Sequence, residues 1–369
     1  MTRTGNSAPS GAANYNKSML LEGIFAAVPT PFYSDERVYY RKIEANMARY
    51  SRSLMAGMVV LGSTGEAMAL DDAESREVLR VAAEATAPEK VLIAGVGRES
   101  VKGTVELAEA AARYQYDAVL VKAPTYYATQ LQSAGVMRHF LCVADRSPLP
   151  LVLYNIPKCA PFDIPVEMIA ELAQHPNIIA IKDSSGNLDR IGATVEATRN
   201  APRRTVTVTP VFEAVTERML KAKSEAAGTF VAAGDLAGGT ALATAPPSAA
   251  PRTRTKEVGF QTLVGAGSHV LPALQAGASG AVLAFASCAP EACQEIYIAW
   301  KDHDLKLAEE KQQHIIEAER RIGAGLGISG IKYACDFNGY YGGRPRAPLV
   351  SVTAQEKAEI EQLLAEIRN

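Results

Sequence analysis

The chain of 369 residues has no surplus of positive charge. It carries 38 basic and 40 acidic side chains, which gives a net charge of -2. Proteins that bind nucleic acid usually gather Lys and Arg to neutralise a row of phosphates. The charge balance therefore argues against a nucleic-acid partner.

Cysteines are few, and their spacing does not suit cross-links or metal binding. The five are Cys142, Cys159, Cys288, Cys293 and Cys335. An odd number without a C-x-x-C pair indicates neither a disulfide framework nor a zinc site. We expect reduced thiols in a cytoplasmic protein that binds no metal.

Long apolar runs are also absent. No run approaches the roughly 20 residues that a membrane-spanning helix needs. The first eighteen residues, Met1–Ser18, lack the hydrophobic core of a secretory signal. We expect residues 1–18 to form a flexible tail. A transit peptide is the alternative, because such segments are also poor in acidic residues.

What the chain does contain is a regular alternation of short apolar runs and amphipathic stretches. Each run has four to six residues, mostly Val, Ile, Leu and Ala without polar alternation, which is typical of strands buried on both faces. The eight runs are Gly23–Val28, Met58–Leu61, Val91–Ala94, Ala118–Val121, Leu151–Tyr154, Ile178–Ile181, Phe260–Val264 and Ala281–Phe285. The predicted helices include Asp72–Ala87, Val101–Tyr114 and Pro165–Gln174, the last with Asp163 as its N-cap.

Eight strands with interleaved helices predict the α/β class and a closed (β/α)8 TIM barrel. No glycine-rich dinucleotide fingerprint follows the first strand, which weakens the alternative of a Rossmann fold. We expect the barrel to span residues 19–290 and a helical region to extend it over residues 291–369.

Residues 201–258 interrupt this alternation. They contain a Val/Thr run (Thr205–Thr209), a predicted helix (Phe212–Ser224) and an Ala/Gly/Thr/Pro-rich segment (Gly234–Thr255). Low-complexity segments of this kind seldom pack into a core. We therefore interpret residues 201–258 as an insert before the seventh strand, forming a mobile loop or a small subdomain.

Two polar residues stand at the ends of neighbouring predicted strands. Active sites of such barrels lie at the carboxyl ends of the strands. The sixth strand runs into Lys182, whose neutral amine could attack a carbonyl in an apolar pocket. The fifth ends at Tyr154, which could move protons during that reaction. The structural alternatives are a lysine that extends to the barrel rim and an aromatic ring that fills the mouth.

Two further segments follow the second and third strands. Gly62–Glu66 combines glycines with the hydroxyls of Ser63 and Thr64, and its free N–H groups could hold a carboxylate. The alternative is a tight turn capped by Ser or Thr. Arg98 lies just past the third strand, where it could reach a distal carboxylate or remain solvated on a loop.

Taken together, these residues resemble the dihydrodipicolinate synthase and N-acetylneuraminate lyase family of class I aldolases. The resemblance runs from about Leu21 to Leu364, interrupted by the insert. The motifs that carry it are Gly62–Glu66, Pro124–Tyr127, Tyr154–Pro157 and Ile178–Asn187. It implies a (β/α)8 barrel, a homotetramer built as a dimer of dimers, a small 2-oxo acid substrate and no metal or organic cofactor.

The resemblance also implies roles for individual residues. Lys182 is similar to the lysine that forms the Schiff base, and Tyr154 to the tyrosine that relays protons. Ser63 and Thr64, followed by Gly65, resemble the segment that binds the carboxylate of the 2-oxo acid. Tyr127 resembles a relay tyrosine contributed by a neighbouring subunit, although Tyr126 is adjacent and could take that place.

The substrate is less uniform within this family. Its synthases, which condense pyruvate with aspartate semialdehyde, place an arginine after the Tyr-x-x-Pro segment. Here Cys159 occupies that place, with Lys158 beside it. A thiol cannot make the paired contacts of a guanidinium with a carboxylate.

Other segments resemble the 4-hydroxy-2-oxoglutarate aldolase branch, and that branch implies that Ser184 contacts the substrate. The segments are Gln174–Ile178, Lys182–Ser184, Arg190–Gly192, Asn338–Gly343 and Arg346–Leu349. The leading hypothesis is therefore retro-aldol cleavage of a 4-hydroxy-2-oxo acid, such as 4-hydroxy-2-oxoglutarate, to pyruvate plus an aldehyde. The synthase reaction is the alternative. An inactive barrel with a binding or scaffold role is the alternative of another class, in which the insert displaces the seventh strand, blocks the mouth or disrupts the subunit contact.

Overall fold

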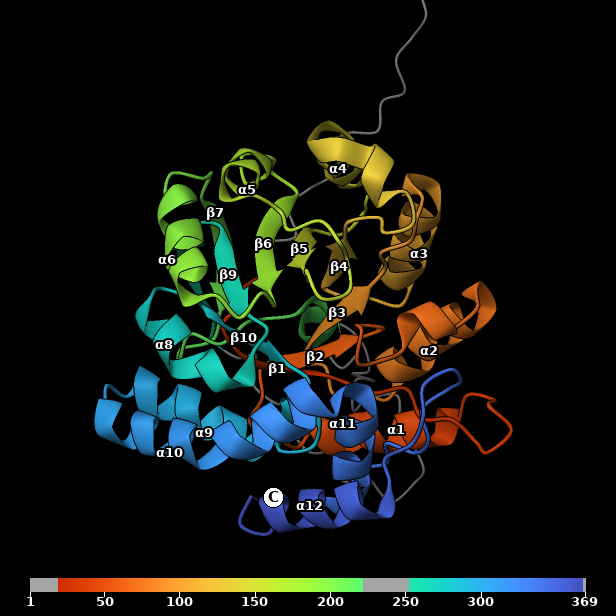
Figure 1. Ribbon diagram of the computed structural model, residues 1–369. Helices are drawn as coiled ribbons and strands as arrows, with labels where there is room; N and C mark the ends of the chain where they lie inside the picture. Colours follow the sequence, from red (N-terminus) through yellow and green to blue (C-terminus); the bar gives the residue numbers. More distant parts are fainter. Residues whose placement is uncertain (1–18, 222–251, 368–369) are drawn as a thin grey trace, which may run out of the picture.

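Eight parallel strands close into a barrel in the computed structural model, which describes residues 19–221 and 252–367 (Figure 1). The strands are β1 (Gly23–Ala27), β2 (Gly57–Val60), β3 (Val91–Gly95), β4 (Ala118–Lys122), β5 (Leu151–Asn155), β6 (Ile178–Asp183), β9 (Gln261–Val264) and β10 (Gly280–Leu283). They pair in that order, and β10 closes the barrel on β1. The predicted fold is confirmed, and each of the eight apolar runs overlaps one barrel strand.

Both faces of the strands are buried, which explains why their sequences lack polar alternation. Side chains that point inward fill the barrel, among them Phe25, Ile93 and Leu120. Side chains that point outward, such as Ile24 and Leu92, pack against the surrounding helices. Because the barrel is filled in this way, polar residues reach solvent chiefly where the strands end.

A ring of helices covers the strands (Figure 1). The helices are α1 (Tyr40–Tyr50), α2 (Asp72–Glu84), α3 (Val101–Arg113), α4 (Ala128–Ala144), α5 (Val166–Leu172), α6 (Leu188–Ala197), α8 (Val270–Gln275) and α9 (Pro290–Lys301). Short 3₁₀ helices follow three of the strands, namely η1 (Ala67–Ala69), η3 (Gly267–His269) and η4 (Phe285–Ser287).

The end of the chain is helical, as predicted. After α9 it forms α10 (Leu305–Ala318), the π-helix η5 (Glu319–Gly325), α11 (Gly327–Phe337) and α12 (Ala354–Leu364). In Figure 1 these elements, in blue, lie along one side of the barrel. None of the helices described by the structure is long and apolar enough to cross a membrane.

One local prediction is wrong. Asp163 does not cap α5, because Pro165 occupies the N-cap position and no side chain caps that end. Instead, an Asp163 carboxylate oxygen accepts a hydrogen bond from Asn155 Nδ2 at 2.8 Å. Asp163 therefore ties the α5 segment to the end of β5.

The described part of the insert forms an antiparallel hairpin of β7 (Arg204–Val208) and β8 (Arg254–Val258). The predicted helix begins at residue 217, later than expected, and the structure describes it only as far as residue 221. Most of the low-complexity segment, residues 234–251, lies outside the described residues. The predicted tail, residues 1–18, lies outside them as well.

This hairpin packs against the end of the barrel where the strands begin. Arg204 donates to the backbone oxygens of Met19 and Gly259, close to the starts of β1 and β9. Arg218, which follows the hairpin's first strand, donates to the backbone oxygen of Lys90 and forms an ion pair with Asp117. The described part of the insert is therefore at the end opposite the carboxyl ends of the strands, and it does not block the barrel mouth.

Candidate active site

Lys182 and Tyr154 lie opposite each other in the paired strands β6 and β5. Their side chains therefore point the same way, and Lys182 Nζ lies 3.3 Å from Tyr154 Oη. Nζ is also 4.4 Å from the centre of the tyrosine ring. Both residues are more than 90 % buried, so the amine is shielded from bulk water by the phenol that would exchange protons with it.

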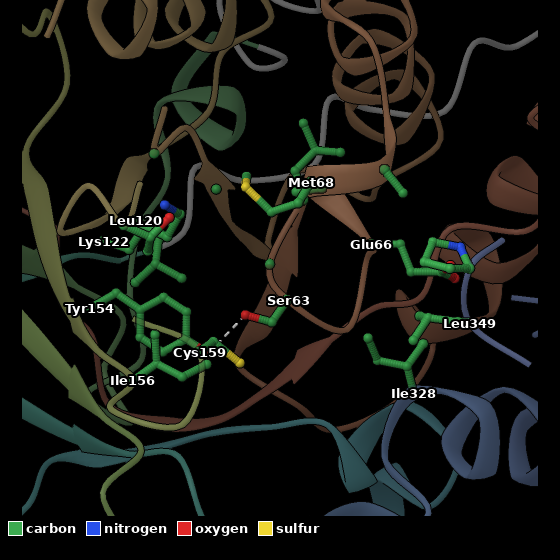
Figure 2. Close-up of a pocket in the computed structure, with 18 of the residues that line it drawn as sticks. Ser63, Glu66, Met68, Leu120, Lys122, Tyr154, Ile156, Cys159, Ile328 and Leu349 are labelled. Atoms are coloured by element: carbon green, nitrogen blue, oxygen red, sulfur yellow. Dashed lines mark hydrogen bonds between the residues drawn. The ribbon is translucent and has the colours of Figure 1, made fainter. Parts of the chain in front are cut away.

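The turn after β2 brings a second hydroxyl to this pair. Ser63 Oγ lies 3.3 Å from Tyr154 Oη (Figure 2). A chain of polar groups therefore runs from Lys182 through Tyr154 to Ser63. Thr64 is buried beside it. The N–H groups of Ser63 and Thr64 donate to no acceptor among the residues that the structure describes. They are free to receive a ligand oxygen.

Close packing holds this turn in place. Thr30 Oγ1 donates to the carbonyl of Gly65 at 2.7 Å. A Cβ at Gly65 would lie only 3.2 Å from the Val28 carbonyl oxygen and 3.3 Å from that of Gly62. A glycine therefore suits this position because the backbone of two neighbouring segments approaches it closely.

The residues that follow Tyr154 and Lys182 in their strands point the other way and fix the strand ends. Asn155 Nδ2 donates to Asp183 at 3.0 Å, and Arg190 Nε donates to the same carboxylate oxygen at 2.8 Å. Asn155 and Asp183 are almost completely buried. This network was not among the features predicted from the sequence. The signal was present, since polar residues follow the two candidate catalytic residues directly.

A pocket of about 530 Å³ opens at the mouth beside Tyr154 and Ser63 (Figure 2). It is mostly apolar and extends between the strand ends and the C-terminal segment near Leu349. Cys159, at the place of the synthase arginine, lines it. Lys182 does not line the pocket but contacts Tyr154, which does.

Glu99 organises the loop that carries Tyr127. Its carboxylate accepts hydrogen bonds from the backbone N–H groups of Thr125 and Tyr126, at 2.8 and 2.9 Å, and from Lys122 Nζ at 3.1 Å. These donors together lower the pKa of Glu99 to about 2, although partial burial opposes them. Nothing in the sequence analysis pointed to Glu99, because it lies in a loop without a recognisable motif.

Besides Lys182, Thr64 and Gly65, three other predicted site residues do not line the pocket. Tyr127 is 56 % exposed at the start of α4 and lies outside the pocket lining of its own chain. Arg98 turns toward α2, where it donates to Ser75 Oγ at 2.8 Å and contacts Asp72. The distal-carboxylate role predicted for Arg98 therefore finds no support in its position. Ser184 packs against Gly265, its N–H bonded to the Asn155 carbonyl.

The described residues 19–221 and 252–367 contain no group of three or more His, Cys, Asp or Glu side chains arranged to hold a metal ion. The polar groups at the mouth are instead an amine, a phenol, hydroxyls and free amide N–H groups. That set of groups suits covalent capture of a carbonyl compound and binding of its carboxylate.

Comparison with known families gives a match over most of the chain. The family model described as the Dihydrodipicolinate synthetase family matches residues 20–221 and 249–367. Between these ranges lie residues 222–248, within the segment that interrupts the alternation of strands and helices. The family match therefore includes every strand of the barrel and the C-terminal helices.

Individual relatives and solved structures agree with this match. A 4-hydroxy-tetrahydrodipicolinate synthase from Acidiphilium cryptum is 28 % identical over 92 % of this chain and 96 % of its own length. One from Hyphomonas neptunium is 28 % identical over 94 % and 98 %. Among solved structures, a dihydrodipicolinate synthase from Bacillus anthracis superimposes with a TM-score of 0.74 at 22 % identity, covering 94 % of this chain and 99 % of its own. A prophage protein of that family from E. coli K12, in complex with pyruvate, gives 0.73 at 22 %, covering 94 % and 99 %.

Proposed function

The chain belongs to the dihydrodipicolinate synthetase family and is a lyase of the class I aldolase type, and we propose that its Lys182 captures a 2-oxo acid such as pyruvate as a Schiff base. The observation that carries the proposal is the buried contact of 3.3 Å between Lys182 Nζ and Tyr154 Oη at the barrel mouth. The pyruvate bound to the E. coli family member supports the choice of 2-oxo acid.

The reaction begins when the neutral Lys182 amine attacks the ketone carbon of the 2-oxo acid. The attacking nitrogen gives up its two protons, which reach the ketone oxygen through Tyr154, and loss of that oxygen as water leaves the imine. Removal of a proton from the adjacent methyl carbon then gives an enamine, which adds to the carbonyl carbon of an aldehyde. Hydrolysis of the product imine releases Lys182. The reverse sequence is a retro-aldol cleavage, so one site serves both directions.

The turn containing Ser63 and Thr64 binds the carboxylate of the 2-oxo acid. Its two free N–H groups are the donors, and the Ser63 hydroxyl lies 3.3 Å from Tyr154 Oη. Binding there orients the ketone carbon toward Lys182, which lies 3.3 Å beyond the same phenol oxygen. No metal or organic cofactor takes part in this scheme.

The relay is completed by Tyr127 from a second subunit of a homotetramer. The exposed position of Tyr127 supports this arrangement, because the ring projects from its own chain instead of lining its own pocket.

Mixing two inactive variants tests whether the relay is shared between subunits. In mixed oligomers of Lys182→Met and Tyr127→Phe, a site with an intact lysine receives an intact tyrosine, and activity returns. The control is Tyr126→Phe, which removes the neighbouring hydroxyl and should be active without any mixing. Failure of any mixture to regain activity contradicts the shared relay.

The names of the curated relatives favour the synthase alternative, which condenses pyruvate with aspartate semialdehyde, over cleavage of 4-hydroxy-2-oxoglutarate, and so favour the direction of condensation whichever aldehyde this chain accepts. An inactive barrel is the less favoured reading, because the described part of the insert lies at the far end of the barrel and Lys182, Tyr154 and Ser63 are in contact. We therefore propose an active aldolase that works in the direction of condensation.

Borohydride reduction in the presence of pyruvate tests the proposal directly. Intact and peptide mass spectrometry should find one pyruvate-derived adduct per chain, located on Lys182 and absent from Lys182→Met. The peptide containing Lys332, another buried lysine, is the internal control and should remain unmodified. If no 2-oxo acid gives an adduct on Lys182, the Schiff-base mechanism is wrong.

A further inference from the structure

The part of the pocket farthest from Lys182 is apolar. One side is formed by Met68, Ile328, Ala347, Pro348 and Leu349, which we call the distal wall. These residues come from the 3₁₀ helix after β2, from α11 and from the segment that precedes α12. Figure 2 shows Leu349 and Ile328 across the pocket from Tyr154 and Cys159. An aldehyde that reacts with an enamine on Lys182 would direct its substituent into this space.

The ionised groups that line the pocket are already paired. Glu66 Oε1 lies 2.6 Å from Lys332 Nζ, and both side chains are fully buried. Lys122 Nζ lies 3.1 Å from Glu99 Oε1. The low pKa of Glu99, about 2, keeps its carboxylate ionised near neutral pH, so Lys122 retains its counter-charge.

The arginines near the mouth are also engaged elsewhere. Arg346 forms an ion pair with Glu74 at 2.7 Å and donates to the Ala69 carbonyl. Arg98 donates to Ser75 on α2. Lys158 is exposed and does not line the pocket, and the adjacent lining residue is Cys159. Among the described residues, no cation without a carboxylate partner lines the pocket to meet a second carboxylate.

We infer that the aldehyde handled by this enzyme carries an uncharged, apolar substituent, and that Cys159 and the distal wall select it. The inference rests on the proposed function, because it assumes a 2-oxo acid on Lys182. The carboxylate of a carboxylated aldehyde would lose its hydration in this pocket without gaining an ion pair. An alkyl or aryl substituent would instead gain contact with apolar side chains. Both aspartate semialdehyde and glyoxylate carry such a carboxylate and should be poor partners.

Matched pairs of aldehydes test the inference on the wild-type enzyme with pyruvate in excess. Butanal and succinic semialdehyde have the same chain length and differ in a terminal methyl against a carboxylate. We expect kcat/KM to be at least tenfold higher for butanal, and to rise along the series acetaldehyde, propanal and butanal. Aspartate semialdehyde is measured beside them.

One substitution should reverse the preference. Cys159→Arg supplies an unpaired guanidinium at the pocket, so it should raise kcat/KM for succinic semialdehyde relative to butanal by at least tenfold. Cys159→Met, which is long but uncharged, is the matched control and should retain the wild-type ratio. Each variant is first treated with pyruvate and borohydride, so that its Lys182 adduct is known to form.

The outcomes distinguish a wrong aldehyde preference from a wrong Schiff-base mechanism. A wild-type enzyme that prefers succinic or aspartate semialdehyde overturns the inference, as does one that forms the Lys182 adduct but accepts none of the aldehydes. A wild-type enzyme that forms no adduct with pyruvate overturns the proposed function instead.

Discussion

Lys332 and Glu66 form an ion pair with 2.6 Å between Nζ and Oε1, and neither side chain reaches solvent. Lys332 belongs to α11, whereas Glu66 ends the turn after β2, so the pair connects the C-terminal helices to the segment proposed to bind the substrate carboxylate. Lys332 also donates to the Thr30 carbonyl, and Glu66 accepts from the Arg346 N–H. The ion pair therefore fixes the position of the turn.

Removing Lys332 should destabilise the fold strongly. In Lys332→Met the Glu66 carboxylate remains buried without its cation, and such losses typically amount to about 3–5 kcal/mol. Burial lowers the pKa of Lys332, and the neighbouring Glu66 carboxylate opposes that effect. Urea unfolding followed by circular dichroism measures the change in the free energy of unfolding.

The double variant Lys332→Met/Glu66→Gln is the control. It removes both charges, so it should recover part of the stability lost in the single variant. If Lys332→Met alone unfolds at the wild-type urea concentration, the pair does not stabilise the fold.

Tyr154→Phe should slow catalysis with little change in the structure. The phenol oxygen lies within 3.3 Å of both Lys182 Nζ and Ser63 Oγ, so its loss breaks the polar chain between the amine and the Ser63 hydroxyl. A proton-transfer group typically contributes a factor of about 10²–10⁴ to the rate, and we expect kcat to fall within that range. Steady-state kinetics and single-turnover imine formation measure it.

Tyr114→Phe, at the C-cap of α3 and outside the pocket lining, is the control and should retain wild-type kcat. A Tyr154→Phe enzyme with more than one tenth of the wild-type kcat would remove the phenol from the proposed relay.

The fold was predictable from the sequence because each barrel strand is a short apolar run buried on both faces. The run at Leu151 ends within one residue of β5, since the strand stops where polar side chains begin. The insert was harder to predict. Its Val/Thr run pairs with Arg254–Val258, almost fifty residues away. No local sequence pattern predicts a pairing between strands so distant in sequence.

The candidate site was predictable only in part. Lys182 and Tyr154 were recognisable because each ends a buried strand, and strand register then brings them together. Glu99 and Lys332 were not, because their roles depend on partners from distant segments. Arg98 shows how a side chain near a strand end can turn away from the pocket. Its position after β3 suggested the pocket, but Ser75 on the neighbouring helix provides a closer acceptor.

Glu99→Gln should disturb the loop that carries Tyr127. The neutral amide keeps the size of the side chain but is a weaker acceptor for the Thr125 and Tyr126 N–H groups. Displacement of a catalytic group by about 1 Å can cost up to about a hundredfold in rate, so kcat should fall more than the KM for pyruvate changes. Glu109→Gln, at an exposed position on α3, is the control.

The hydrogen bonds of Glu99 should also make the stability of the protein depend on pH in acid. The native pKa of Glu99 is about 2, below its ordinary value, so the folded state holds the carboxylate ionised while the unfolded chain takes up a proton first. Its contribution to stability is complete above about pH 4.5 and is lost as the pH falls toward 2. Between those values Glu99→Gln should lose less stability than the wild type. Parallel slopes for the two proteins in acid titrations of urea unfolding would contradict this.

His139, buried in α4, should affect the pH dependence of stability over a higher pH range than Glu99 does. Burial lowers its pKa to about 4, so the folded protein keeps the ring neutral while the unfolded chain binds a proton below about pH 6.5. Stability is therefore lost as the pH falls from about 6.5 to about 4, by at most about 3 kcal/mol. His139→Phe should flatten this part of the pH profile of urea unfolding. An unchanged slope in that range would show that the ring is protonated in the folded state.

Arg218→Met should separate stability from activity, because Arg218 anchors the insert at the end of the barrel opposite Lys182. Its guanidinium forms a buried ion pair with Asp117 at 3.3 Å and donates to the Lys90 carbonyl. Losing one partner of a buried pair can destabilise a fold by up to about 3–5 kcal/mol, although the Leu92 N–H still donates to Asp117 and moderates the loss. Urea unfolding should therefore show a large change.

In the same Arg218→Met preparation, kcat/KM and the pyruvate adduct on Lys182 should remain at wild-type levels at temperatures where the protein is folded. Arg203→Met, an exposed change in the same hairpin region, is the matched control and should affect neither property. A folded Arg218→Met enzyme whose kcat/KM falls more than tenfold would show that the insert acts on the barrel mouth. The scaffold reading, in which the insert governs what the barrel can do, would then regain support.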